Sequence, residues 1–448
     1  MKLREVSGLR RAPMWMLALG AAVGLAVTAC SGTTPDSSGS SSTASPATTG
    51  SITFWTWDKG MDSEVALFNK KYPNIKVNIV NAGQGGAEYT KLQTALKAST
   101  GAPDVVQIEY QYLPTFTITN SLLDLAPYGA NALKDDFVDW AWGQVANNGK
   151  VFAIPQDTGP MGMLYRQDLF DKYGIAVPKT WAEFAAAAKK LHAADPNVYL
   201  TDMPSNEPGA YVGLEWQAGS RPFTVQNTDT VGVTLNDAAA KKVANYWSGL
   251  VSDGVVATDP DFTDAWYQGL ASDRYATWLT AAWGPLFLQG TAKGTAGKWR
   301  VAPLPQWSAG QRAAGNWGGS TTAVVKQTKQ PAAAAAFAMF LNSDPASTAL
   351  LNSDQSLFPA TKALLGSSAF LGQKLDFYGG QTVNQTFADV SSTVVTSFQW
   401  SPFQDYVFSE FNDTVGAALT KKQDVAASLD VWQTAVVGYA KQQGFTVP

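Results

Sequence analysis

The chain has 448 residues, of which 45% are hydrophobic and 15% charged, and its formal net charge is −4 at pH 7. This length exceeds one ordinary hydrophobic core, so we expect two domains of a water-soluble, globular type. The acidic balance argues against nucleic acid as a partner. The chain contains one histidine and one cysteine. The histidine, His192, lies on a predicted helix over 181–193, where we expect an exposed or capping helix-end residue. We therefore expect neither a zinc enzyme nor a Ser-His-Asp enzyme, and we predict neither a metal nor a cofactor.

The first 30 residues have the order of a secretory signal peptide. Four basic residues precede an apolar stretch over residues 14–27, and Val27-Thr28-Ala29-Cys30 follows it. Small residues before a lone cysteine resemble the lipobox of bacterial lipoproteins. This resemblance implies that residues 1–29 are removed and that lipid is attached to Cys30. The alternatives are a buried thiol and a cleavage that leaves the cysteine free.

Without residues 1–29, which hold four basic residues and one acidic residue, 28 Lys+Arg and 35 Asp+Glu remain, a formal charge of −7. The next segment, up to Gly50, consists almost wholly of Ser, Thr, Gly, Pro and Ala. We therefore predict that residues 30–50 form a lipidated, disordered tether that reaches roughly 25 Å. A glycosylated stalk has the same composition. No later apolar run reaches the ~18 residues of a membrane-spanning helix.

The body opens with a strand over residues 52–58, a helix from residue 62 and strands over 75–80 and 105–109, with a second helix between those strands. This βαβαβ order predicts a parallel, doubly wound sheet. Ligands of such sheets bind beyond the carboxyl ends of the strands, which is where Trp57 and Asp58 lie. An aromatic face can stack on a sugar ring while a carboxylate accepts its hydroxyl protons. The glycines at 83–86 lack phosphate-binding spacing and read as a tight loop.

Later segments continue to alternate between strands and helices. Thr180 and Glu183 form the pattern of a capping box before a helix over 181–193, and Asn236 is expected to cap another helix. Strands are expected over 151–154 and 321–325, and Pro331 suits the first turn of an alanine-rich helix. The pattern from residue 425 onward is helical. We assign three tryptophans to the core, namely Trp181, Trp247 and Trp432.

Several motifs in this order resemble the extracellular solute-binding lipoproteins of bacterial ABC sugar importers, the maltose-binding-like family. They are Phe54-Trp-Thr-Trp-Asp58, Ala102-Pro-Asp-Val-Val106, Leu164-Tyr-Arg-Gln-Asp-Leu-Phe170 with Pro178-Lys-Thr-Trp181, Ala282-Trp-Gly-Pro285 and Trp317-Gly-Gly319. The resemblance spans nearly the whole mature body. It implies a two-lobed α/β periplasmic-binding-protein fold of type II, in which each lobe is a mainly parallel sheet flanked by helices.

The resemblance also implies how the chain is divided. An N-lobe would comprise residues 51–156 and 308–354, and a C-lobe residues 157–307 and 355–448. The chain would cross between lobes near Ile154–Pro160, Pro303–Trp307 and Gln355–Pro359. The implied ligand-binding residues are Trp57, Asp58, Gln84, Glu109, Tyr110, Asp157, Trp216, Trp283, Trp317 and Trp400. Residues 197–233 match the family only at Trp216-Gln217, which leaves the identity of the sugar open.

The function implied by the resemblance is sugar capture without catalysis. The protein would be a monomer, held by the lipid on Cys30 at the extracellular face of the cell membrane, that delivers its sugar to the transmembrane subunits of an ABC permease. Two alternatives remain. The same fold could bind a polyamine, a peptide, an anion such as phosphate, or a metal. A secreted glycoside hydrolase would need two carboxyl groups about 5–9 Å apart.

Overall fold

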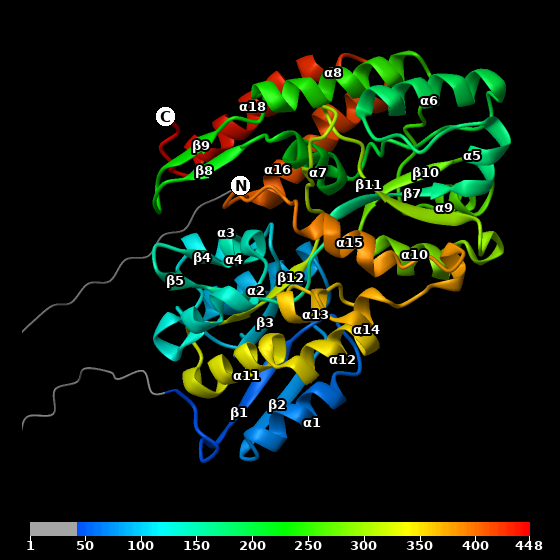
Figure 1. Ribbon diagram of the computed structural model, residues 1–448. Coiled ribbons are helices and arrows are strands. Elements are labelled where there is room, and N and C mark those ends of the chain that lie inside the picture. Colours follow the sequence, from blue (N-terminus) through cyan, green and yellow to red (C-terminus); the bar gives the residue numbers. More distant parts are fainter. Residues whose placement is uncertain (1–42) are drawn as a thin grey trace, which may run out of the picture. The chain divides into compact units, whose positions relative to one another are not determined.

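The computed structural model describes residues 43–448 (Figure 1). The predicted signal peptide, Cys30 and the tether up to residue 42 lie outside the described residues. The last part of the expected tether is folded: the amide of Thr48 donates to the carbonyl of Ser45 over 2.9 Å, and Gly50 already begins strand β1 (Gly50–Trp55). Among the helices of residues 43–448, none has the length and hydropathy needed to cross a membrane.

A five-stranded sheet with the order β2-β1-β3-β12-β6 contains the first strands of the body. As predicted, β1 runs parallel to β2 (Ile75–Val80) and to β3 (Val105–Glu109). The other two strands, β12 (Ser320–Val324) and β6 (Ala153–Pro155), pair antiparallel to their neighbours. Ile52 and Phe54 of β1 are fully buried, so this strand anchors the core beneath the sheet.

A second sheet has the order β10-β7-β11, and both of its ladders are antiparallel. The expectation of a mainly parallel sheet in each lobe is therefore wrong here. Strands β10 (Thr277–Ala281) and β11 (Trp299–Pro303) are parallel to each other and are linked through helix α10, as in a βαβ unit. Strand β7 (Met161–Arg166) arrives from the first sheet and inserts between them. Sequence order alone does not reveal this insertion.

Helices cover both sheets (Figure 1). Helix α11 packs on β1, β6 and β12, and helix α15 packs on β7 and β11. Helices α7, α8, α16 and α18 pack against one another.

The remaining strands form two short β-hairpins, β4 (Ala146–Asn147) with β5 (Lys150–Val151) and β8 (Phe223–Val225) with β9 (Val231–Val233). The α-helices are α1 (Asp62–Lys71), α2 (Gly86–Ala98), α3 (Leu113–Ile118), α4 (Asp139–Val145), α5 (Gln167–Tyr173), α6 (Trp181–Ala194), α7 (Pro208–Ala218), α8 (Ala238–Ser252), α9 (Asp264–Ala271), α10 (Gly284–Thr291), α11 (Pro331–Ser343), α12 (Pro345–Gln355), α13 (Lys362–Leu365), α14 (Ser368–Leu371), α15 (Val383–Ser391), α16 (Gln404–Phe411), α17 (Ala417–Thr420) and α18 (Val425–Gln442).

Helix starts follow local side-chain chemistry. The capping box of Thr180 and Glu183 is confirmed at the start of α6, and Pro331 occupies the first turn of α11. The prediction that Asn236 caps α8 is wrong by one residue, because the carboxylate of Asp237 accepts the amide of Ala240 over 2.8 Å. The three tryptophans assigned to the core, Trp181, Trp247 and Trp432, are buried as expected.

The chain passes between the two sheets three times within the described residues, after β6, after β11 and after α12, and two of these passages pair with the first. Asp157 forms a β-bridge with Pro359 and Pro160 forms one with Asn316. The amide of Trp317 donates to the carbonyl of Gly159 over 2.8 Å. These contacts hold three remote parts of the chain side by side where one sheet gives way to the other.

This pairing requires a glycine at position 159. A Cβ atom there would lie 2.0 Å from the carbonyl oxygen of Trp317, a separation that atoms do not tolerate. The peptide that precedes β12 can therefore approach the first passage only because residue 159 has no side chain.

We predict that Gly159→Ala lowers the free energy of unfolding by roughly 1–3 kcal/mol, because two backbone segments must separate to admit a methyl group. The matched control is Gly249→Ala in α8, where the added Cβ meets no atom within 4 Å and should stabilise the helix by up to about 1 kcal/mol. Urea denaturation measures both. Equal effects of the two substitutions would contradict the steric argument.

Candidate functional site

A cavity of about 410 Å³ lies between the first sheet and the helices α7 and α16. It lies at the carboxyl end of β3, beside the glycine loop that follows β2, and opposite the first turn of α7 and part of α16. Its position agrees with the rule that ligands of α/β sheets bind beyond the carboxyl ends of strands. The lining residues are Gln84, Gly85, Glu109, Gln111, Tyr112, Glu207, Pro208, Gly209, Trp317, Gly318, Trp400 and Phe408.

On one side of the cavity, Glu109 ends strand β3. Its carboxylate accepts the hydroxyl of Tyr89 over 3.1 Å, and its own amide donates to the same hydroxyl oxygen over 2.9 Å. Burial raises the pKa of Glu109 to about 7, against hydrogen bonds from Tyr89 and Gln111 that lower it. The carboxyl group is thus held in a fixed orientation and can accept a hydrogen bond from a ligand.

On the opposite side, Glu207 stands directly before helix α7 and presents a second carboxyl group to the cavity. It is half-buried, and burial raises its pKa to about 7. Each wall of the cavity therefore contributes one acidic group. Sequence analysis did not single out this residue.

Two tryptophans meet edge to face at the cavity. The ring centroids of Trp283 and Trp317 lie 4.8 Å apart at an interplanar angle of 77°, and the Trp283 ring nitrogen donates to the carbonyl of Trp317 over 3.0 Å. Trp317 lines the cavity, whereas Trp283 supports it from behind. Gly209 permits this arrangement, because a Cβ there would lie 2.6 Å from the Trp317 ring nitrogen.

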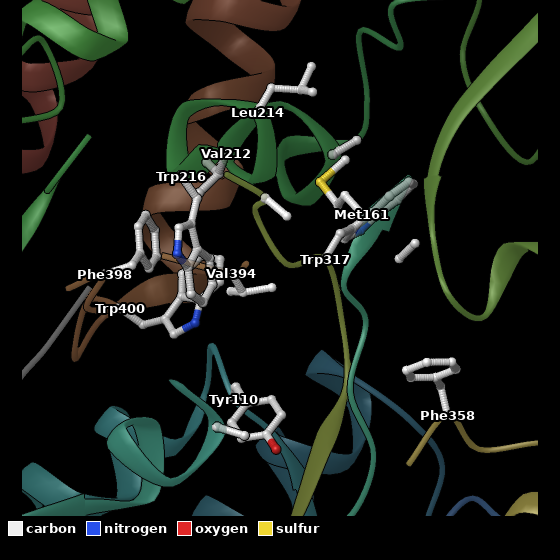
Figure 2. Close-up of a cluster of buried hydrophobic side chains, with 14 of the residues drawn as sticks. Tyr110, Met161, Val212, Leu214, Trp216, Trp317, Phe358, Val394, Phe398 and Trp400 are labelled. Carbon is white, nitrogen blue, oxygen red and sulfur yellow. The ribbon is translucent and has the colours of Figure 1, made fainter. Parts of the chain in front are cut away.

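A second aromatic group contains Trp216, Phe398 and Trp400 (Figure 2). Trp216 is fully buried, stacks on Phe398 with centroids 4.2 Å apart and donates its ring N–H to the carbonyl of Val395 over 2.6 Å. Trp400 contacts both rings and also lines the cavity. The structure therefore places Trp216 in the core behind Trp400, and not among the residues that line the cavity.

Asp58 and Asp157 belong to a hydrogen-bonded network next to the first passage between the sheets. Asp58 accepts from the side-chain amides of Gln107 and Gln156 over 3.0 and 2.9 Å, and Asp157 accepts the amide of Ser320 over 2.8 Å. Burial raises the pKa of Asp58 to about 7 and that of Asp157 to about 6. Neither residue is among those lining the cavity.

Of the ten predicted ligand-binding residues, four line the cavity, namely Gln84, Glu109, Trp317 and Trp400. The other six do not: Trp57, Asp58, Tyr110, Asp157, Trp216 and Trp283. Trp57 is half-buried. Tyr110 is 1% exposed, and its ring packs 5.9 Å from Trp140.

Sequence reasoning missed Gln111, Tyr112, Glu207 and Phe408. Tyr112 follows the end of β3 by three residues, so the strand-end rule could have included it together with Gln111. Glu207 lies in the segment that no motif anchors. Phe408 belongs to α16, and no strand end or motif marks it in the sequence.

A larger cavity, of about 540 Å³, is lined by residues around Pro178, the loop 309–314 and Val390. It contains none of the predicted ligand-binding residues and no tryptophan. Another cavity, of about 440 Å³, lies beside Asp139 and Trp140 and also contains none of the predicted ligand-binding residues. We place the site in the cavity of about 410 Å³, because four of the predicted residues line it together with the carboxyl group of Glu207. Within residues 43–448, no group of three or more potential ligands is arranged to hold a metal ion.

The chain is similar to known binding proteins over most of its length. A family model described as bacterial extracellular solute-binding protein matches residues 55–348. The lactose-binding protein of Rhizobium radiobacter is 27% identical over 368 residues, which cover 76% of this chain and 82% of that protein.

The chain is also similar to solved structures of binding proteins. The ABC transporter associated binding protein from B. animalis subsp. lactis Bl-04, in complex with β-1,6-galactobiose, is 34% identical, with a TM-score of 0.75 over 89% of this chain and all of that one. The galacto-N-biose-/lacto-N-biose I-binding protein from Bifidobacterium longum, in complex with lacto-N-biose, is 27% identical, with a TM-score of 0.77 over 89% of this chain and 99% of that one. These similarities confirm the predicted type II periplasmic-binding-protein fold.

The raised pKa values give a prediction about pH. A carboxyl group with a raised pKa binds its proton more tightly in the folded protein than in the unfolded chain, so its contribution to stability is lost as pH rises. Asp58, whose pKa rises from 3.8 to about 7, should destabilise the fold progressively between about pH 4 and pH 7. We predict that Asp58→Asn matches the wild type at about pH 4 and is more stable by roughly 1–2 kcal/mol at pH 8.

The control is a variant whose stability should change in the opposite direction. Hydrogen bonds from Lys241 and Asn236 lower the pKa of Asp430, so Asp430→Asn should reduce stability at neutral pH. Thermal denaturation of both variants from pH 4 to 8 measures the difference. If Asp58→Asn gained no stability at pH 8, the carboxyl group would not be held protonated by burial.

Proposed function

Because the chain belongs to the bacterial extracellular solute-binding protein family, we propose that it is the sugar-binding component of an ABC importer. The observation that carries this proposal is the cavity itself, in which Trp317 and Trp400 provide aromatic surfaces and Glu109 and Glu207 provide hydrogen-bond acceptors. A sugar presents an apolar C–H face and a rim of hydroxyl groups, which match these two kinds of surface.

The ligand that we propose is a short saccharide. A volume of about 410 Å³ falls in the range of small-molecule sites, which measure about 300–1,000 Å³. Similar proteins bind β-1,6-galactobiose, lacto-N-biose and lactose. Galactose-containing disaccharides are therefore the first candidates.

Binding would be coupled to closure of two lobes, residues 51–156 with 308–354 and residues 157–307 with 355–448. A ligand that contacts Glu109 on one side and Glu207 on the other favours the conformation in which both contacts exist. The paired passages around Asp157 and Asn316 would act as the hinge. The remaining predicted ligand-binding residues, Trp57, Asp58, Tyr110, Asp157, Trp216 and Trp283, would support the site from behind.

No covalent step is needed for this function, and the similar proteins described above are binding proteins. We therefore propose that the protein is not an enzyme. It would act as a monomer at the extracellular face of the cell membrane, where lipid on Cys30 holds it near the transmembrane subunits of the permease. Two attached acyl chains would suffice for stable anchoring.

One prediction tests the tryptophans that line the cavity. Tryptophan fluorescence titrated with β-1,6-galactobiose, lacto-N-biose and lactose should show saturable binding, with the sugar recovered unchanged. Trp317→Ala should weaken binding about tenfold, because stacking on one aromatic ring contributes roughly 0.5–1.5 kcal/mol beyond the apolar area that it buries.

The control is Trp307→Ala, which removes a half-buried tryptophan that does not line the cavity. Its affinity should equal that of the wild type. Equal losses in the two variants would remove Trp317 from the site. Cleavage of the sugar would show a hydrolase.

A separate prediction tests the lipid anchor on Cys30. Cys30→Ser should move the protein from the membrane fraction to the culture medium and abolish incorporation of labelled fatty acid, while sugar affinity stays unchanged. Membrane retention of the serine variant would contradict the lipid anchor.

A further inference from the structure

The cavity contains acidic groups without basic partners. Glu109 and Glu207 both line it, and its lining includes no lysine, arginine or histidine. A third carboxyl group, that of Asp405 on α16, accepts a hydrogen bond from Tyr112, another lining residue. Tyr112 also lies beside the ring of Phe408, with centroids 6.5 Å apart. Three carboxyl groups from three different elements thus surround one tyrosine at the cavity.

Two basic groups on elements that neighbour the cavity residues in sequence or through other carboxyl groups, Lys91 and Arg274, are occupied elsewhere. Lys91, in the helix that follows the glycine loop, donates to the carbonyl of Ala82 over 2.6 Å and lies near the buried carboxyl group of Glu88. Arg274 is paired with Asp259 over 2.7 Å. Neither cation lines the cavity, so a negative charge brought by a ligand would meet no compensating charge there.

Unpaired polar atoms show what the cavity does accept. Trp400 lines the cavity, and its buried ring N–H has no hydrogen-bond partner within the described chain; the residue is only 4% exposed. It needs an acceptor such as a hydroxyl oxygen. The carboxylates need donors such as hydroxyl or ammonium groups. The aromatic faces of Trp317 and Trp400 attract a cation and offer nothing to an anion.

We propose that this cavity selects its saccharides by charge: it accepts neutral and amine-bearing sugars and rejects sugars that carry a carboxylate, phosphate or sulfate. This inference rests on the proposed function and adds the class of sugar to it. Glu207 is the residue that sets the preference on the α7 side, opposite Glu109.

Matched ligands test the proposal with the purified protein. Isothermal titration calorimetry at pH 8 compares β-1,6-galactobiose, lacto-N-biose and lactose with derivatives whose non-reducing 6-hydroxyl is replaced by a carboxylate or by an amine. We expect the carboxylate derivative to bind at least tenfold more weakly than its neutral parent, and the amine derivative to bind as tightly or more tightly. A carboxylate derivative that binds as well as its parent would overturn the inference and leave the proposed function standing.

A substitution of Glu207 distinguishes the effect of its charge from the effect of its shape. Glu207→Gln keeps the size of the side chain, so the ratio of neutral to carboxylate affinity should fall at least threefold while the neutral sugar still binds. The control is Glu410→Gln on α16, which changes the net charge equally but lies outside the lining and should keep the wild-type ratio. Equal changes in both variants, or no change in either, would overturn the role of Glu207.

The pH dependence of the preference for neutral sugars is a second test of charge selection. Glu109 faces Tyr89, Gln111, Asp157 and Asp405, and Glu207 lies near Asp261 and Tyr112. Because protonation neutralises these carboxyl groups, the preference for the neutral sugar should shrink between pH 8 and pH 5. An unchanged ratio would contradict charge selection. If none of the nine compounds bound at any pH, the inference and the proposed function would both fail.

Discussion

The structure depends on the pairing of three chain segments at the junction of its two sheets. Asp157 bridges to Pro359 and Pro160 bridges to Asn316, and the close approach of Gly159 to Trp317 admits no side chain. This pairing places the end of β3, the segment that precedes β12 and the first turn of α7 around one cavity. Trp317, which belongs to the paired segments, is also a wall of that cavity. The junction and the site are therefore the same piece of structure.

The second feature of the site is its concentration of half-buried carboxyl groups without cations. Glu109 and Glu207 line the cavity, and Asp58 and Asp157 lie in the adjoining network; burial raises the pKa of each. Such groups destabilise the folded protein as pH rises. A ligand rich in hydrogen-bond donors can pair with these carboxyl oxygens, which favours the binding of a polyhydroxylated molecule.

Much of the fold could be predicted from the sequence because periodicity and capping are local. The strands at 75–80 and 105–109, the capping box at Thr180 and the proline at the start of α11 all follow from neighbours along the chain. The insertion of β7 between β10 and β11 could not be predicted, since strand pairing is not local. The site divides in the same way. Glu109 follows from a strand end, whereas Glu207 and Phe408 enter through tertiary packing, and the burial of Trp216 behind Trp400 depends on Phe398, which is remote in sequence.

The most direct test of this account is a crystal structure of the protein with the disaccharide that it binds most tightly. The account predicts a sugar ring against Trp317 or Trp400, with hydroxyl groups within hydrogen-bond distance of Glu109 and Glu207. A sugar seated instead in the larger cavity beside Pro178 and Val390 would contradict the assignment of the site and every role derived from it.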